Sequence, residues 1–158
     1  KYNLRPGAPN LIDRIEAGLL SFGNDMTSEN SPLECGFEKY CALSSDIDFI
    51  GKAKLKSEKN IGPKLKLCGI AFGGEAQSAC TIPWPIYFNN LKIGEITSGI
   101  YNPSLKVNTG IALVMTENLD KFSTVKVKAL NSKISEGIIC SLPFTISKNY
   151  ELINQIRY

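Results

Sequence analysis

Lys64-Leu65-Lys66-Leu67 alternates charged and apolar side chains, and Val125-Lys126-Val127-Lys128 repeats the pattern. Successive side chains of a strand point to opposite faces, so this period of two predicts half-buried strands. The pair Asn89-Asn90 is a candidate hairpin turn, because Asn tolerates positive φ. About six strands joined by short turns predict a small antiparallel β-barrel or sandwich. The short apolar runs behind this prediction are residues 64–72, 79–88, 91–97, 110–115, 124–130 and 134–140.

The start of the chain has helical periodicity instead. Apolar residues recur at helical spacing from Asn10 to Phe22 and predict a helix over that range. Asn10 is a favoured N-cap residue, with Asp13 three positions on as a weak capping box, and Gly23 suits the position just past the end. The polar residues 24–32 predict a loop.

A second helix and a boundary follow. Residues 33–43 are predicted to be extended, and a Lys-rich helix is predicted from Ile50 to Lys59. The cluster NIGP at residues 60–63 ends this helix and marks the boundary. The expected fold class is therefore α+β, with a helix and strand segment at residues 1–62 and the antiparallel β-barrel at residues 63–158.

Composition narrows the possible functions. A chain of 158 residues is expected to form one domain, or one domain and a fragment. A net charge of +3 gives no reason to expect a nucleic-acid or membrane partner, and no apolar run approaches the roughly 18 residues of a membrane helix. The sequence has no histidine, which excludes Ser-His-Asp and Cys-His relays and His-ligated zinc within this chain. Chemistry must come from carboxylates, Lys, Tyr, Cys or a cofactor.

The cysteines indicate a reducing compartment. Their number is odd and no pair has C-x-x-C spacing, so neither a disulfide framework nor a zinc site is predicted. Most lie in apolar surroundings, where Cys behaves as a small core residue. We therefore expect a cytoplasmic protein with structural thiols. The five are Cys35, Cys41, Cys68, Cys80 and Cys140.

Two charged features carry no clear chemistry. The lysines between residues 52 and 66 have no Arg and no aromatic residue among them, which favours a solvated face over a nucleic-acid surface. Asp46 and Asp48 lack the Gly and distal Glu of a calcium loop. We therefore expect no metal site.

Four stretches together resemble one protein family. Residues 14–26 (RIEAGLLSFGNDM), 31–37 (SPLECGF) and 48–52 (DFIGK) resemble the R-[LI]-E-x-G-x-x-x-[YF]-G-x-D-[MI], [TN]-P-[LF]-E-x-G-L and D-F-[IV]-G-K elements of the glycine cleavage T-protein family. Residues 93–104 resemble its G-x-[IV]-T-S-G-x-x-S-P turn. The family comprises tetrahydrofolate-dependent aminomethyltransferases and their relatives. The similarity runs over nearly all of the chain in one collinear order.

Within the family, the likeness is best to the branch that demethylates dimethylsulfoniopropionate. Residues 9–16 (PNLIDRIE) and 32–36 (PLECG) are similar to that branch. Asn10 stands where aminomethyltransferases carry the Arg of an A-R-D signature. The resemblance implies the C-terminal portion of a methyltransferase that moves a methyl group from a sulfonium to N5 of tetrahydrofolate.

Three alternatives stay open. The first is a glycine cleavage aminomethyltransferase with a lipoyl carrier partner. The second is a non-catalytic folate-binding relative, although the K-G-C-Y-x-G-Q-E signature of such proteins is absent from this sequence. The third is an unrelated β-barrel that binds nucleic acid, which a salt-dependent affinity would reveal.

The resemblance also implies an architecture. Members are three-lobed with folate in a central channel, so residues 1–62 would be the tail of the central folate-binding fold and residues 63–158 the closing barrel. The catalytic residues would lie in the portion N-terminal to this segment, and the segment alone is expected to be inactive. The implied partners are a small-molecule methyl donor, that N-terminal portion and a second copy in a homodimer.

The matched motifs nominate residues for the cofactor. Glu16, Arg14 and Glu34 are the candidate tetrahydrofolate-binding residues. An intramolecular ion pair that anchors the loop at Asp25 or Glu34 is an equally open role for the motif helix. Trp84 could belong to an aromatic cage for a sulfonium, but the prolines on either side favour packing.

Overall fold

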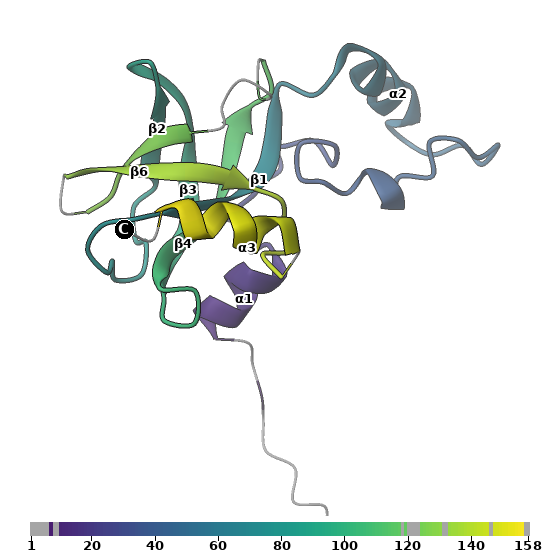
Figure 1. Cartoon of the computed structure of the whole chain (residues 1–158). Coiled ribbons are helices and arrows are strands. Elements are labelled where there is room, and N and C mark those ends of the chain that lie inside the picture. Colours follow the sequence, from purple (N-terminus) through teal and green to yellow (C-terminus); the bar gives the residue numbers. More distant parts are fainter. Residues whose placement is uncertain are drawn as a thin grey trace, which may run out of the picture.

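A closed antiparallel barrel forms the body of the molecule (Figure 1). The computed structural model describes residues 7, 10–117, 119, 124–130, 133–145 and 147–156. Around the barrel the strands follow the order β1-β4-β3-β2-β5-β6 and close on β1. This confirms the predicted α+β class with a small barrel. The elements are α1 (Leu11–Ala17), the 3-10 turn η1 (Glu38–Tyr40), α2 (Lys52–Ile61), β1 (Leu65–Phe72), β2 (Trp84–Phe88), β3 (Leu91–Asn102), β4 (Val107–Met115), β5 (Thr124–Lys128), β6 (Ile134–Cys140), α3 (Ser147–Ile153) and η3 (Asn154–Ile156).

Two irregularities set the course of β3. The turn from β2 into β3 uses Asn89 and Asn90 at φ 48° and 65°, which confirms the predicted hairpin. Further along, the pairing with β4 slips between Ile96 and Ser98, so Thr97 is an extra residue on β3. Such a bulge bends the strand and redirects its side chains. Thr97 and Ser98 are both buried, at the place where α1 and its following loop meet the barrel.

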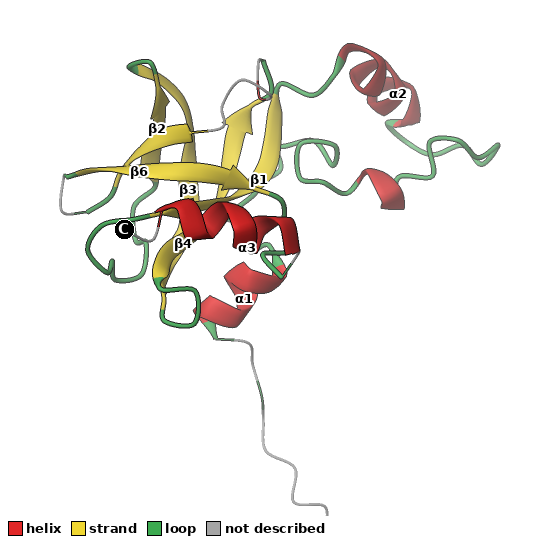
Figure 2. Ribbon diagram, in the orientation of Figure 1, coloured by secondary structure: helices red, strands yellow, loops and turns green. Residues whose placement is uncertain are grey.

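The barrel has an apolar core on each side of its wall. The inner core includes Phe72 and Trp84, whose rings meet edge to face with centroids 5.9 Å apart. The outer core joins Ile15 of α1, Ile111 of β4 and Ile153 of α3. Figure 2 shows both helices beside the strands, as this shared core requires. Strands buried on two faces explain why several runs are apolar without alternation.

Space for Trp84 comes from two glycines paired across β3 and β4. A Cβ at Gly99 would lie 2.6 Å from the Trp84 ring, and a Cβ at its partner Gly110 would lie 2.5 Å from Ile96 Cγ2. Neither distance is sterically possible, so the close approach requires glycine. Trp84 is 2% exposed, which confirms the packing role predicted for it.

The helix α2 and the loop before it stand away from the barrel, whereas the turn before η1 contacts β1 (Figure 1). This second helix is shifted two residues from its predicted bounds. The prediction of an extended segment at residues 33–43 is wrong, because this stretch forms turns and η1. Phe37 N donates to Pro32 O, and Cys35 N donates to Ser31 O. Three apolar residues at alternate positions are too short a pattern to distinguish a strand from a series of turns.

The first helix is shorter than predicted. It ends at Ala17, because Gly18 adopts the left-handed conformation at φ 69° and its N–H donates to the carbonyls of Arg14 and Ile15. Asn10 caps the other end, where its side chain accepts from Asp13 N at 2.9 Å, as predicted. The early end frees residues 19–26 to form the loop that the site uses.

The boundary between residues 62 and 63, predicted to separate the helix and strand segment from the barrel, stays a prediction.

Among the described residues, no helix is long and apolar enough to cross a membrane. No group of three or more His, Cys, Asp or Glu side chains among them is arranged to hold a metal ion.

Candidate functional site

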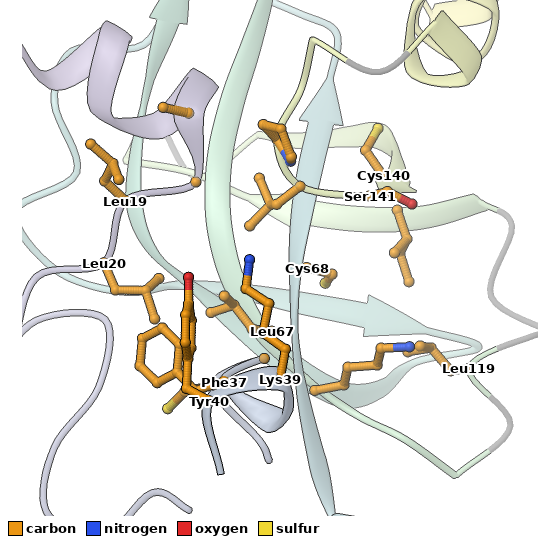
Figure 3. Close-up of a pocket in the computed structure, with 18 residues that line it drawn as sticks. Leu19, Leu20, Phe37, Lys39, Tyr40, Leu67, Cys68, Leu119, Cys140 and Ser141 are labelled. Carbon is orange, nitrogen blue, oxygen red and sulfur yellow. The ribbon is translucent and has the colours of Figure 1, made fainter. Parts of the chain in front are cut away.

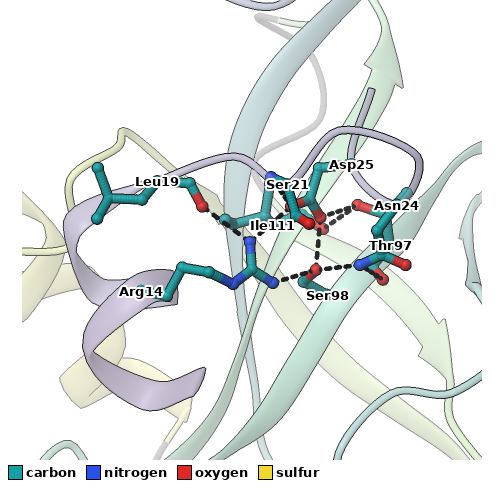
Figure 4. Close-up of polar contacts among 8 residues, drawn as sticks. All are labelled: Arg14, Leu19, Ser21, Asn24, Asp25, Thr97, Ser98 and Ile111. Atoms are coloured by element: carbon teal, nitrogen blue, oxygen red, sulfur yellow. Dashed lines mark hydrogen bonds and ion pairs between the residues drawn. The ribbon is translucent and has the colours of Figure 1, made fainter. Parts of the chain in front are cut away.

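The first motif helix is fixed to the barrel by a buried ion pair (Figure 4). Asp25, 1% exposed, accepts from Arg14 Nη1 at 2.6 Å. The same carboxylate accepts from Ser21 N at 2.8 Å and from Thr97 Oγ1 at 2.8 Å. Since the carboxylate has partners on three elements, it holds α1, its following loop and β3 together.

Ser98 completes this network. Its hydroxyl donates to Asp25 Oδ1 at 2.5 Å and accepts from Arg14 Nη2 at 2.5 Å and from Asn24 Nδ2 at 2.6 Å. Arg14 Nη1 also donates to Leu19 O. The ion pair considered as an alternative, with Asp25 as partner, is therefore confirmed. Sequence reasoning missed Thr97 and Ser98, although both stand in the matched T-S-G turn.

Glu16 faces another part of the barrel. Its Oε1 accepts from Asn102 Nδ2 at 2.6 Å, and Asn102 Oδ1 in turn accepts from Leu105 N. Asn102 ends β3 and is fully buried. The backbone carbonyl of Glu16 accepts from Phe144 N at 2.8 Å. Glu16 thus ties α1 to the β3–β4 turn and to the segment after β6.

Glu34 lies in the turn before η1. Its Oε2 accepts from Ser31 N at 3.2 Å, while Ser31 Oγ accepts from Glu34 N at 3.1 Å, in the reciprocal manner of a capping box. The Glu34 carbonyl accepts from Leu67 N of β1 at 2.8 Å. Glu16, Arg14 and Glu34 therefore have separate sets of partners, and the structure does not bring the three into one cluster.

A groove of about 650 Å³ lies between the end of α1, the η1 turn and the strands β1 and β6 (Figure 3). Phe37, Lys39 and Tyr40 line it from the turn, and Lys66 and Leu67 line it from β1. Lys39 Nζ lies 4.9 Å from the Tyr40 ring centroid, within cation–π range. Sequence reasoning missed this groove, because residues 33–43 were predicted to be extended and Lys66 was assigned to a solvated face.

The thiols beside this groove are poor nucleophiles. Burial raises the pKa of Cys68 and of Cys140 to about 12. Burial also raises the pKa of Cys80, which does not line the groove, to about 11. Only a thiolate attacks carbon or binds metal, so these three side chains act as core residues at neutral pH.

Comparisons with known proteins show which family the chain belongs to. No family model matches it. It is 43% identical to the dimethylsulfoniopropionate demethylase DmdA of Ruegeria pomeroyi, over 71% of this chain and 30% of that protein. It is 33% identical to an aminomethyltransferase of Bacillus pumilus, over 83% of this chain and 35% of that protein. The chain corresponds to the C-terminal part of the glycine cleavage T-protein family.

A solved T-protein has the same fold. The glycine cleavage system aminomethyltransferase T of Bartonella henselae matches 85% of this chain and 37% of its own, with a TM-score of 0.64 and 21% identity. This chain spans about a third of the length of the curated relatives it matches. It is therefore similar to one segment of these longer proteins.

Proposed function

We propose that the complete protein transfers a methyl group from dimethylsulfoniopropionate to tetrahydrofolate. The observation that carries this proposal is the 43% identity to a dimethylsulfoniopropionate demethylase, compared with 33% to the Bacillus pumilus aminomethyltransferase. Asn10 supports it, because this residue caps α1 where aminomethyltransferases carry an Arg. The demethylase and the aminomethyltransferase differ in the methyl or aminomethyl donor, so the donor is the point to test.

The proposed chemistry suits a chain without histidine. When bound, tetrahydrofolate would supply the nitrogen that accepts the methyl group. The carbon–sulfur bond of a sulfonium breaks with its electron pair going to sulfur, which leaves as a neutral sulfide. Such a leaving group needs no proton, and the proton that N5 carries would pass to water once the methyl group is attached. Alignment of donor and acceptor therefore does more than acid catalysis. The residues of this chain would then serve to hold in place the elements that surround the bound donor and acceptor.

The residues present fit part of tetrahydrofolate. That cofactor has a flat pterin, a benzoyl ring and a glutamate with carboxylates, and the groove offers aromatic rings at Phe37 and Tyr40 with ammonium groups at Lys39 and Lys66. In contrast, the Arg14 guanidinium already has three partners. Glu16, Arg14 and Glu34 remain the proposed folate-binding residues of the complete protein. Each would contribute by holding in place the helix, loop or turn that forms part of the folate site.

The same proposal covers the organisation of the complete protein. Residues 1–62 would be the tail of the central folate-binding fold and residues 63–158 the closing barrel. The position of α2 away from the barrel supports a boundary after this helix, although α1 packs on the barrel. The catalytic residues would lie N-terminal to this segment, in a cytoplasmic protein that forms a homodimer.

The direct test is an assay of the complete protein with tetrahydrofolate and dimethylsulfoniopropionate. We expect 5-methyltetrahydrofolate and methylthiopropionate in equal amounts. A protein that binds folate tightly but forms neither product at high enzyme concentration would contradict the proposed donor.

The second candidate is glycine cleavage aminomethyl transfer. The aminomethyltransferases among the relatives, at 33% identity for the Bacillus pumilus protein, favour it. Methylene transfer to tetrahydrofolate that depends on an aminomethylated lipoyl carrier protein would support it over the sulfonium donor. Folate binding without either activity would leave the non-catalytic relative.

A further inference from the structure

The loop before α2 is folded around a buried lysine. Lys52 is 8% exposed, and its Nζ donates to Ser45 O at 2.6 Å and to Ile47 O at 2.5 Å. The same ammonium lies 5.9 Å from the centroid of the Phe49 ring, within cation–π range. In the described part of the chain, Lys52 forms no ion pair. Its ammonium thus holds the loop in one shape against the start of α2.

The shape that Lys52 maintains leaves two isoleucine side chains in solvent. Ile47 is 72% exposed and Ile50 is fully exposed. Gly51, which follows them, turns the chain into α2 at φ 90°. This arrangement inverts the usual one, in which lysine is exposed and isoleucine is buried. A loop that buries its cation and exposes its apolar side chains is suited to contact an apolar surface of another segment.

Helix α2 has little packing of its own. Lys52 is its one buried residue, and no residue of α2 belongs to either core of the barrel. Its side chains contact the turn before it, where Ser31 Oγ donates to Glu58 Oε1 and Lys59 Nζ lies 2.7 Å from Glu38 Oε1. An isolated helix of this length is marginal in water. The loop and α2, residues 44–61 and here called the arm, are therefore held on one side and uncovered on the other.

We propose that the arm is a docking element, and that Ile47 and Ile50 insert into an apolar pocket on the portion of the complete protein that precedes this segment. The inference rests on the organisation given under the proposed function. Length points to this occupant, because the chain matches the C-terminal part of its relatives and spans about a third of them, so most of such a protein lies N-terminal to it. Lys52 is the positioning residue, since a loop already held in its bound shape loses little conformational entropy on docking.

The test is footprinting of the unmodified complete protein. A photoactivated diazirine labels exposed aliphatic side chains, and mass spectrometry reads the label at each residue. The controls are Leu91 and Ile134, which are 63% and 62% exposed on the barrel. We expect Ile47 and Ile50 to take up about tenfold less label than the controls, because burial at the centre of an interface removes nearly all of the area that the reagent reaches.

Two results of the footprinting would overturn the inference. One is equal labelling of the two isoleucines and the two controls, which would leave methyl transfer unaffected. The other is protection that disappears on dilution to the monomer, because a second copy would then cover the arm. Protection in a protein that transfers no methyl group would instead support the inference and contradict the proposed function.

A double variant tests the insertion itself. In the complete protein, Ile47→Asp/Ile50→Asp should raise amide exchange in α2 by at least about tenfold, because each buried isoleucine contributes about a factor of ten to the docking equilibrium. Ile134→Asp, the matched control on β6, should leave exchange in α2 unchanged. The fluorescence of Trp84 verifies that the barrel is folded in both. Unchanged exchange in the double variant would overturn the inference.

A second pair of variants tests the positioning role. Lys52→Met keeps most of the apolar stem but removes the ammonium, so labelling of Ile47 and Ile50 should rise several-fold as the loop loses its shape. Lys54→Met, at an exposed position on the same helix, should leave the labelling unchanged. Equal labelling in the two lysine variants would contradict the role assigned to Lys52.

Discussion

Asp25 is the residue on which the contact between α1 and β3 most depends. Its carboxylate is buried and is shared by Arg14, Thr97 and Ser98. Asp25→Asn keeps the shape of the side chain but leaves Arg14, whose side chain is 17% exposed, without its counter-ion. Removing one partner of a buried pair typically costs about 3 kcal/mol. Urea unfolding followed by the fluorescence of Trp84, the one Trp in this chain, measures the loss.

The control is an exposed pair in the same barrel. Lys92 and Glu95 are 2.8 Å apart, with side chains 54% and 41% exposed. Lys92→Met should change the free energy of unfolding by less than about 1 kcal/mol, because water screens such pairs. Equal losses for Asp25→Asn and Lys92→Met would show that the buried network does not anchor α1.

The buried thiols make stability depend on alkaline pH. The pKa of Cys68 and that of Cys140 are raised by burial from 9.0 to about 12. The unfolded chain therefore loses these protons from about pH 9, while the folded chain keeps them up to about pH 12. Unfolding releases protons in that window, so stability is full below pH 9 and falls as the pH rises from there.

Each fully buried thiol would add up to about 1.4 kcal/mol of loss per pH unit above 9. Urea midpoints at pH 8.0, 9.5 and 10.5 check this expectation. Cys68→Ala/Cys140→Ala should show a shallower decline, since the other titrating groups remain. An unchanged slope in the double variant would contradict the assignment of the loss to the two thiols.

At the scale of the element, the end of α1 is decided by one glycine. Gly18 adopts φ 69°, and a Cβ there would lie 3.1 Å from Leu142 Cβ. Gly18→Ala should cost about 1–2 kcal/mol from the left-handed backbone alone, and more because of the Leu142 contact. Gly23→Ala is the matched control, since Gly23 is also left-handed at φ 85° but has nothing within 4 Å of a Cβ. Equal costs in thermal unfolding would exclude a contribution from Leu142.

An element can be predicted from the sequence when residues close together in the chain determine it, and not when contacts between distant segments do. The barrel strands were predictable because their period-two runs and Asn turns are local signals. The end of α1 was placed at Gly23, since nothing local distinguishes the two glycines; the early stop depends on packing with the segment after β6. The extended structure predicted for residues 33–43 was wrong for a related reason, because a few alternating apolar residues also occur in turns.

The candidate site was predictable to the same degree. The motif around Arg14 identified the helix and allowed an ion pair with Asp25 as one alternative. The partners of this carboxylate on β3 depend on a bulge that no local sequence pattern predicts. The groove was out of reach, because Lys39 and Lys66 come from segments that meet only when η1 folds against β1.

For the whole molecule, the domain boundary predicted from the sequence need not be the limit of the unit that packs and folds together. The boundary predicted at 62/63 separates α1 from the barrel, yet Ile15 of α1 is fully buried in the outer core with Ile111 and Ile153. A segment of residues 63–158 would keep α3 on that outer face but lose the part of the outer core that α1 supplies. We expect it to unfold at a lower urea concentration than residues 10–158 and to bind a hydrophobic dye.

Point variants separate loss of packing from loss of length. Ile15→Ala in the longer segment should cost about 2–4 kcal/mol, because it leaves a cavity in the outer core. Ile50→Ala, at a fully exposed position on the stretch that stands away from the barrel, should change stability by less than about 0.5 kcal/mol. If residues 63–158 alone unfold at the same urea concentration as residues 10–158, α1 adds nothing to the barrel and the folding unit begins at the predicted boundary. If instead the shorter segment and Ile15→Ala are both destabilised while Ile50→Ala is not, the helix that carries the family motif is part of the barrel's folding unit.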